Sequence, residues 1–594
     1  MRSTFVVLVI LFLSVLAVAA AVPTVSYTIH IKSADLSGFD VEMRFRSATP
    51  TVRVAMAAHP EYDDRYWRYI ENFTAESAGK QLNISKTQDT VWKIDGVSGI
   101  VVVRYRLHLP PQVNENRDAW KPFLTSTGGM VGDLHSLMYV VGNSSAPSQL
   151  TLDMPADWKA ASGLESNRDV RIFAGSAELM LDAPVMVGKF QEWNFTAGRV
   201  PHKIVVWSPA DAPTFDSAPL VDGLKKIAAE AIRTFGAPPY HRYVFLFQNG
   251  GEAALEHLTS VNIGHTFSRG MDGLFEEVAH EYFHAWNLMD VRPVERVGLQ
   301  TTFARPTGVL WWNEGATIMF ADYLLRRAGL PGSEPSRITH LETAMTRYFS
   351  SPGYITLSAE QMSRGDTDPG GLGDYGGSTH LQGELLSTIL DLAIRDHSDG
   401  QRDVTDVMTL LSDRFDYRRG ITNHDIEQAA LQVCPSCDIH TFFKDHIYGA
   451  GQIDFDKYLG LLGMRSEVTR SAALGSDGKP SVDLRIGPLQ NDVADGFKIR
   501  ITNPQSTWGK AGLHTGDRLL SVDGTPVSSW PDLRAWLRKL KIGDVGRLEI
   551  VHNGVKKTVE VPIAGYDVPT VKISEISAPT PRQLKLRNVW MSAN

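Results

Sequence analysis

The stretch that decides the fold of this chain is LFEEVAHEYFHAWNLMDVRP, residues 274–293, where two histidines flank a glutamate in the pattern His-Glu-x-x-His. Its apolar residues recur at helical spacing, so a helix is expected. His280 and His284 are four residues apart and therefore lie on one helix face, where both imidazoles can reach one metal ion. Glu281 points aside from that face and can hold a water molecule beside the metal. The pattern alone also occurs in helices that bind nothing, so other parts of the chain must decide.

Composition and charge describe an ordinary globular protein with several domains. The chain has 594 residues, of which 43% are hydrophobic and 21% are charged. This length exceeds what a single hydrophobic core supports. The formal net charge is −8, and no run of Lys and Arg could follow a phosphate backbone. We therefore expect no nucleic-acid partner.

The N-terminal segment MRSTFVVLVILFLSVLAVAAAVP is typical of a cleavable signal peptide. It has one positive residue, Arg2, then an apolar run, then Ala19 and Ala21 in the arrangement that signal peptidase accepts. The alternative is a membrane anchor, but the run is short for a bilayer span and no basic stop follows it. We expect a signal over residues 1–21, a periplasmic or secreted protein, and no stable membrane span after cleavage.

The period of the hydrophobic pattern changes along the chain and predicts a multidomain α+β protein. Strand-like alternation in VSYTIHI, GIVVVRYRLHLP and PHKIVVW gives way to helical spacing in PLVDGLKKIAAEAIRTFG and HLQGELLSTILDLAIRDH. The Gly-rich stretch SRGDTDPGGLGDYGGS, residues 363–378, is expected to be a loop. The predicted order is a β-rich N-terminal domain (22–206), a mainly helical catalytic domain (207–466), a linker (467–477), a small C-terminal domain (478–566) and a tail (567–594).

The two cysteines, Cys434 and Cys437, stand in VCPSCD. A Cys-x-x-Cys pair can be half of a zinc ribbon or a redox motif, but no second pair completes a four-cysteine site and no thioredoxin-like pattern surrounds it. In an exported protein a small local disulfide is favoured.

The small C-terminal domain resembles a bacterial PDZ domain, most specifically in AGLHTGDRLLSVDG, residues 511–524. The resemblance implies that an extended peptide adds as a strand beside a sheet edge, with its terminal carboxylate held by backbone amides near Arg485, Ile486 and Gly487. The resemblance therefore implies peptide C-termini as partners. The alternative is a module that only packs on the enzyme.

The combination of signal, helical histidine pair, Asn-Glu-Gly at residues 313–315 and PDZ-like domain resembles the glycyl aminopeptidase family of PDZ-containing zinc metallopeptidases, in the gluzincin group. HEYFHAWN and FFKDHIYGAGQIDFDKYLGLLG also look like family blocks. The resemblance implies a thermolysin-like catalytic domain with Zn²⁺ held by His280, His284 and Glu314. It also implies that Glu281 takes a proton from the zinc-activated water and passes it to the leaving amine.

A substrate-binding segment is expected in QNGGEAALEHLTSVNI, residues 248–263. The resemblance implies that Glu256, beside His257, binds the α-amine of the substrate, so that only the first peptide bond reaches the metal. Ala253 stands where the family has glycine. The alternative is that Glu256 and His257 are only polar residues of an edge strand.

The chain departs from the family in STHLQGELL, residues 378–386, where Thr379, His380 and Gln382 replace a run with aromatics and a lysine. The family tyrosine of that run is expected to donate a hydrogen bond to the oxyanion. His380, or Tyr375 in the Gly-rich loop, is the candidate replacement.

These features predict an exported zinc aminopeptidase for short peptides with small first residues, Gly or Ala. The alternatives are a zinc endopeptidase and a weakly active zinc-binding protein that works through its PDZ domain. Because the predicted ligands and Glu281 precede the linker, the PDZ domain is expected to be dispensable for dipeptides.

Overall fold

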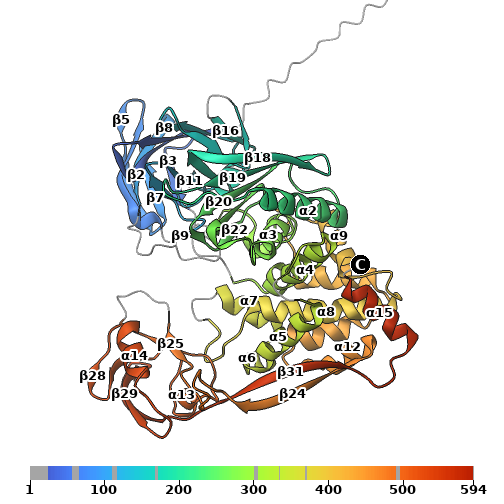
Figure 1. Cartoon of the computed structure of the whole chain (residues 1–594). Helices are drawn as coiled ribbons and strands as arrows, with labels where there is room; N and C mark the ends of the chain where they lie inside the picture. The colour runs from blue at the N-terminus through green and yellow to red at the C-terminus, as the bar shows by residue number, and fades with distance from the viewer. Residues whose placement is uncertain are drawn as a thin grey trace, which may run out of the picture.

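A computed structural model (Figure 1) describes residues 24–56, 66–109, 117–167, 171–299, 306–332, 335–367, 371–489 and 496–592. The expected signal peptide lies outside these ranges. The multidomain α+β architecture is confirmed, with strands gathered in the N-terminal part and helices in the middle. Among the helices of the described ranges, none combines the length and apolar character needed to cross a bilayer.

Three sheets make up the N-terminal domain. The first has the order β15 (Glu165–Ser166), β16 (Arg171–Ala174), β13 (Ser148–Asp153), β1 (Val25–Lys32), β2 (Asp35–Ser47), β8 (Gly99–His108), β4 (Ile70–Ser77) and β5 (Lys80–Gln81). The second is β12 (Met138–Val140), β3 (Thr51–Met56), β7 (Val91–Asp95) and β6 (Asn83–Gln88), and the third is β10 (Phe123–Thr125), β11 (Gly128–Gly132), β17 (Pro184–Gly188) and β14 (Lys159–Ala161). Strand β1 alternates buried and half-buried residues, as the sequence pattern predicted.

The catalytic domain begins earlier than the sequence predicted, with a sheet of its own. Its order is β18 (Phe190–Ala197), β19 (Val200–Trp207), β20 (Tyr243–Asn249), β23 (Ser260–His265) and β22 (Ala254–Glu256). The predicted boundary at residue 206 is therefore wrong, because β19 pairs in parallel with β20. Its side chains alternate between two cores: Ile204 and Val206 face the catalytic core, whereas Val205 and Trp207 pack on the N-terminal domain.

The helices of the catalytic domain lie close to their predicted positions. They are α2 (Ala218–Phe235), α3 (Leu274–Phe283), a π-helix (Trp311–Ala316) that continues into α4 (Thr317–Arg327), α5 (Arg337–Phe349), α7 (Ala359–Thr367), α8 (Thr379–His397), α9 (Val404–Arg414) and α10 (Asn423–Val433). The Gly-rich stretch is only partly a loop, because its first residues complete α7. Cys434 and Cys437, after α10, form the expected disulfide.

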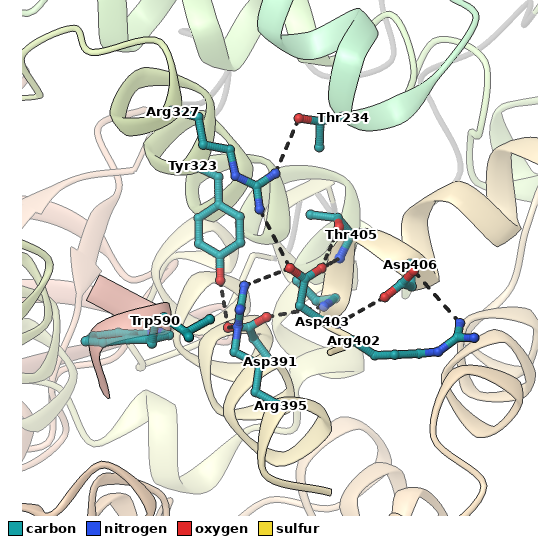
Figure 2. A network of polar contacts seen from close by, with 12 residues as sticks. Thr234, Tyr323, Arg327, Asp391, Arg395, Arg402, Asp403, Thr405, Asp406 and Trp590 are labelled. Carbon is teal, nitrogen blue, oxygen red and sulfur yellow. Dashed lines mark hydrogen bonds and ion pairs between the residues drawn. The ribbon is translucent and has the colours of Figure 1, made fainter. Parts of the chain in front are cut away.

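A buried network of charges joins these helices (Figure 2). Arg395 of α8 is 1% exposed and donates to Asp391 at 2.9 Å and to Asp403, the N-cap residue of α9, at 2.7 Å. Tyr323 of α4 donates its hydroxyl proton to Asp391 at 2.6 Å. The network satisfies a guanidinium that burial would otherwise leave unpaired.

The segments predicted as linker and tail are ordered parts of the fold. β24 (Met464–Ala472) pairs along its length with β31 (Asp567–Glu575), so each strand supplies the hydrogen bonds that the other lacks. A short polar strand of this kind cannot be told from a linker without its distant partner. The final helix, α15 (Pro581–Met591), packs on the catalytic domain, where the carbonyl of Trp590 accepts from Arg337 at 2.5 Å.

The PDZ domain stands between β24 and β31, so the two-stranded ribbon carries it (Figure 1). Its strands are β25 (Ile486–Pro488), β26 (Ile499–Ile501), β27 (Arg518–Val522), β28 (Thr525–Pro526), β29 (Val545–His552) and β30 (Val555–Pro562), with helices α13 (Thr507–Lys510) and α14 (Trp530–Leu537). It has a hydrophobic core of its own, with Trp508 fully buried.

Candidate metal centre

Two histidines and one carboxylate converge at the end of α3. The Nε2 atoms of His280 and His284 lie 3.0 Å apart, and Glu314 Oε2 lies 3.6 Å from the first and 3.3 Å from the second. Ligands at 2.0–2.2 Å in a tetrahedron around zinc stand about 3.4 Å from one another. The donor set and the spacing therefore fit a zinc ion, with His280, His284 and Glu314 as its ligands.

Asn287, which is fully buried, joins the end of α3 to the π-helix that carries Glu314. Its side-chain amide donates to the carbonyl of Trp312 and to Thr317 Oγ1, each at 3.0 Å, and its oxygen accepts from Asn313 at 2.9 Å. The backbone carbonyl of Asn287 faces His284 Nδ1 at 2.8 Å, which leaves Nε2 free for the metal. Sequence reasoning missed this residue, although it stands in the HEYFHAWN block.

Glycines allow the helix that carries His380 to approach Glu314. A Cβ added to Gly315 would lie 2.3 Å from the backbone of Gly383, and one added to Gly383 would lie 1.9 Å from the carbonyl oxygen of Trp311. The π-helix therefore crosses α8 at backbone contact. This crossing brings His380 Nε2 to 3.2 Å from Glu314 Oε2, with the His380 side chain 48% exposed beside the ligands.

Burial and charge tune the ionisable groups. Burial lowers the pKa of His280 to about 4, so its imidazole is neutral, as a metal ligand must be. Burial alone would raise the pKa of Glu314, but protonated His284 and the hydrogen bonds that Glu314 accepts hold it well below its usual range. A metal ion would take the place of the His284 proton, because a ligating imidazole is neutral. Burial raises the pKa of Glu281 well above its usual range, and the negative charges of Glu256 and Glu314 raise it further. Such a shift suits a residue that exchanges protons near neutral pH.

Glu256 lies beside this centre, on the edge strand β22 of the five-stranded sheet. One of its oxygens is within 4.8 Å of a Glu281 oxygen and of a His284 ring nitrogen. Ala253, just before the strand, has φ +56°, a left-handed conformation that favours glycine. Position 253 therefore has the left-handed backbone conformation that a glycine would adopt easily, although the residue is alanine.

His257, another predicted site residue, faces away from the metal ligands. His257 is buried, and its Nδ1 lies 3.5 Å from Asp182 of the N-terminal domain, because side chains alternate along an extended segment and His257 points away from Glu256. The contact with Asp182 gives no support to the predicted substrate-binding role of His257. Tyr375 lies in the loop before α8, and its role as a hydrogen-bond donor to the oxyanion stays a prediction.

The PDZ loop that the sequence assigned to carboxylate binding already uses two of its amides. The amide of Arg485 donates to Asp483 at 3.2 Å, and the amide of Ile486 donates to the carbonyl of Leu484 at 2.8 Å. The Arg485 guanidinium also pairs with Asp483 at 2.7 Å. In this conformation neither amide is available to a peptide carboxylate. Gly487, the third residue of the loop, continues into the pair with β26.

Comparisons with known families agree with this domain content. The chain matches the model described as Peptidase M61 N-terminal domain over residues 26–189, M61 glycyl aminopeptidase over residues 274–375, and PDZ domain over residues 460–563. A search among curated proteins found no match.

The chain was also compared with solved structures. A protein of the aminopeptidase N family from Idiomarina loihiensis matches with a TM-score of 0.71 and 20% identity, covering 94% of this chain and 99% of that chain. An M1 zinc metallopeptidase from Deinococcus radiodurans, a mutant bound to a Tyr-Ser-Ala substrate, has a TM-score of 0.48 and 12% identity, covering 73% of this chain and 94% of that chain.

Proposed function

Since the chain belongs to the M61 glycyl aminopeptidase family of zinc metallopeptidases, we propose that it removes the first residue of short peptides and that Gly or Ala is preferred there. The observation that carries the proposal is the carboxylate of Glu256 within 4.8 Å of Glu281 and His284. A peptide whose α-ammonium pairs with Glu256 presents its first peptide bond, and no later one, to the metal ligands. The preference for small residues rests on the family match alone.

The proposed mechanism divides the work among residues of this chain. His280, His284 and Glu314 would hold a zinc ion, which would supply a Lewis acid for the substrate carbonyl and for the attacking water. Glu281 takes a proton from the attacking water and returns it to the leaving amine. His380 donates a hydrogen bond to the carbonyl oxygen as that oxygen gains charge, in the place of the family tyrosine.

The proposed location is the periplasm or the cell exterior. It is supported by the sequence of the first 21 residues, where an apolar run ends in Ala19 and Ala21. Peptides are the proposed partners of the catalytic site. The occupied amides near Arg485 favour a PDZ domain that packs on the enzyme over one that captures free C-termini.

Metal analysis and hydrolysis of aminoacyl-naphthylamides test the proposal. We expect one zinc per chain, loss of hydrolysis with a chelator, and loss of zinc in Glu314→Ala. Glu281→Gln should keep the zinc and lose nearly all hydrolysis, because the amide has the shape but not the basicity of the carboxylate. Glu277→Gln, the same substitution one turn earlier in α3, is the matched control and should keep both. Undiminished zinc in Glu314→Ala, or near-normal turnover in Glu281→Gln, would contradict the assignment.

A further inference from the structure

The PDZ domain contacts the catalytic domain at the loop that leads into α8. Asp374 accepts hydrogen bonds from His514 Nδ1 at 2.7 Å and from the amide of Thr515 at 2.6 Å. Two residues later, the amide of Gly376 donates to the carbonyl of Thr502 at 2.6 Å. Two of these bonds use backbone groups of the PDZ domain or the loop, so they fix the positions of the chains and not only of flexible side chains.

The opposite side of the loop is held by the turn after α5. Ser351 donates its hydroxyl proton to the carbonyl of Gly376, and a Cβ on Gly353 would lie 2.3 Å from that same oxygen. On the PDZ side, a Cβ on Gly376 would lie 3.0 Å from Thr502 Cβ. The loop is therefore packed between two surfaces, and residue 376 has room for little more than glycine.

A second attachment fixes the PDZ domain on the catalytic domain. Strand β31 runs along α5, where the amide of Val571 donates to Thr346 Oγ1 at 3.0 Å and the amide of Ile573 donates to Glu342 at 2.7 Å. The domain is thus held by its ribbon and by the loop, which defines its orientation.

The loop leads directly into the metal centre. Ser378 is the N-cap residue of α8, and its side chain accepts from the amide of Leu381. His380, four residues after Gly376, stands in the first turn of that helix at 3.2 Å from Glu314. A displacement of the loop would therefore move the first turn of α8 and the imidazole with it.

From these contacts we infer that the PDZ domain is a positioning part of the active site: Thr502, His514 and Thr515 hold the loop at Asp374 and Gly376 so that His380 stays beside Glu314. The inference rests on the proposed function, because it assigns His380 to the reaction. It differs from the expectation that the PDZ domain is dispensable for dipeptides. It also gives this domain a role on substrates too short to reach a peptide-binding groove.

The test uses full-length, zinc-loaded protein and alanyl-naphthylamide. Asp374→Ala should lower kcat about tenfold with a smaller change in KM and unchanged zinc content, because a misplaced catalytic group costs rate more than binding. Asp374→Asn keeps an oxygen that can accept from Thr515 and should restore most of the rate. Gly376→Val, which forces the loop away from Thr502, should also lower kcat. Lys556→Ala is the control, since its ion-pair partner Glu549 lies within the PDZ domain.

Hydrogen exchange of the amides of Thr515 and Gly376 reports, independently of catalysis, whether the PDZ domain holds the loop. Faster exchange in Asp374→Ala, together with the fall in kcat, supports the inference. Native kcat in both Asp374→Ala and Gly376→Val would overturn it, and so would a fall in kcat with native exchange at both amides. A wild-type protein that holds zinc but hydrolyses nothing would contradict the proposed function and the catalytic part of the inference. Hydrogen exchange would then still report whether the PDZ domain holds the loop at Asp374 and Gly376.

Discussion

At the scale of the residue, the candidate metal ligands could be named from the sequence, but the residues that support them could not. His280, His284 and Glu314 could be named because a helical repeat and the Asn-Glu-Gly segment mark them. Asn287, which joins the two segments through buried hydrogen bonds, depends on a contact between distant parts of the chain. His257 was predicted beside Glu256, but side chains alternate along the extended segment, and His257 faces Asp182 instead of the metal ligands.

Ala253 offers a prediction at this scale. Its left-handed backbone costs about 1–2 kcal/mol for a residue with a Cβ. Ala253→Gly should therefore raise the free energy of unfolding, by up to about 1 kcal/mol after the greater chain entropy of glycine is subtracted. Denaturant unfolding measures the change. Ala254→Gly, the next residue and the first of β22, is the control and should destabilise by about 0.5–1 kcal/mol. A loss of stability in Ala253→Gly would mean that the left-handed conformation is not populated.

At the scale of the element, helices were predicted well and pairings were not. The periods that placed α2, α3 and α8 are local properties of the sequence, so they can be recognised without tertiary information. The pairing of β24 with β31 joins segments about a hundred residues apart. The sequence of β19 shows that it is a strand, but not that it pairs with β20 in the sheet of the catalytic domain. The π-helix that presents Glu314 is likewise set by its crossing with α8 rather than by local pattern.

The crossing of the π-helix and α8 gives the second prediction. Gly383→Ala places a methyl group 1.9 Å from the Trp311 carbonyl oxygen, so the helices must separate. We expect a loss of about 1–3 kcal/mol in stability and weaker zinc binding, because Glu314 moves with the π-helix. Thermal unfolding and zinc titration measure the two effects. Gly460→Ala, where an added Cβ meets nothing within 4 Å, is the control. Native zinc affinity in Gly383→Ala would show that the crossing does not position the ligand.

At the scale of the whole molecule, the order of domains followed from the sequence, but their attachment did not. Composition and period separate the β-rich part, the helical part and the PDZ domain. The contacts that join them, such as Trp590 on Arg337 and Asp374 on His514, bring together residues far apart in the chain. No local pattern marks such pairs.

The buried charge network supplies the prediction at this scale. Asp391→Ala leaves Arg395 with Asp403 as its remaining partner in the network and removes the acceptor of the Tyr323 hydroxyl. Removing one member of a buried ion pair costs about 3–5 kcal/mol. The midpoint temperature of thermal unfolding should therefore fall sharply. Asp222→Ala, which removes an exposed pair with Lys226 on α2, should change stability by less than about 1 kcal/mol. Equal effects of the two substitutions would contradict the role of the network.

The measurement that tests the central claim most directly compares free and N-acetylated peptides in the native protein and in Glu256→Ala. If Glu256 pairs with the α-ammonium, acetylation should lower kcat/KM of the native enzyme by about a hundredfold or more, because a half-buried carboxylate is left unpaired. In Glu256→Ala, kcat/KM for free peptides should fall sharply and kcat/KM for acetylated peptides should change little, so the enzyme no longer discriminates between them. This double comparison separates the carboxylate–ammonium interaction from general damage to the fold. Equal cleavage of free and acetylated peptides by the native protein would contradict the account and identify an endopeptidase.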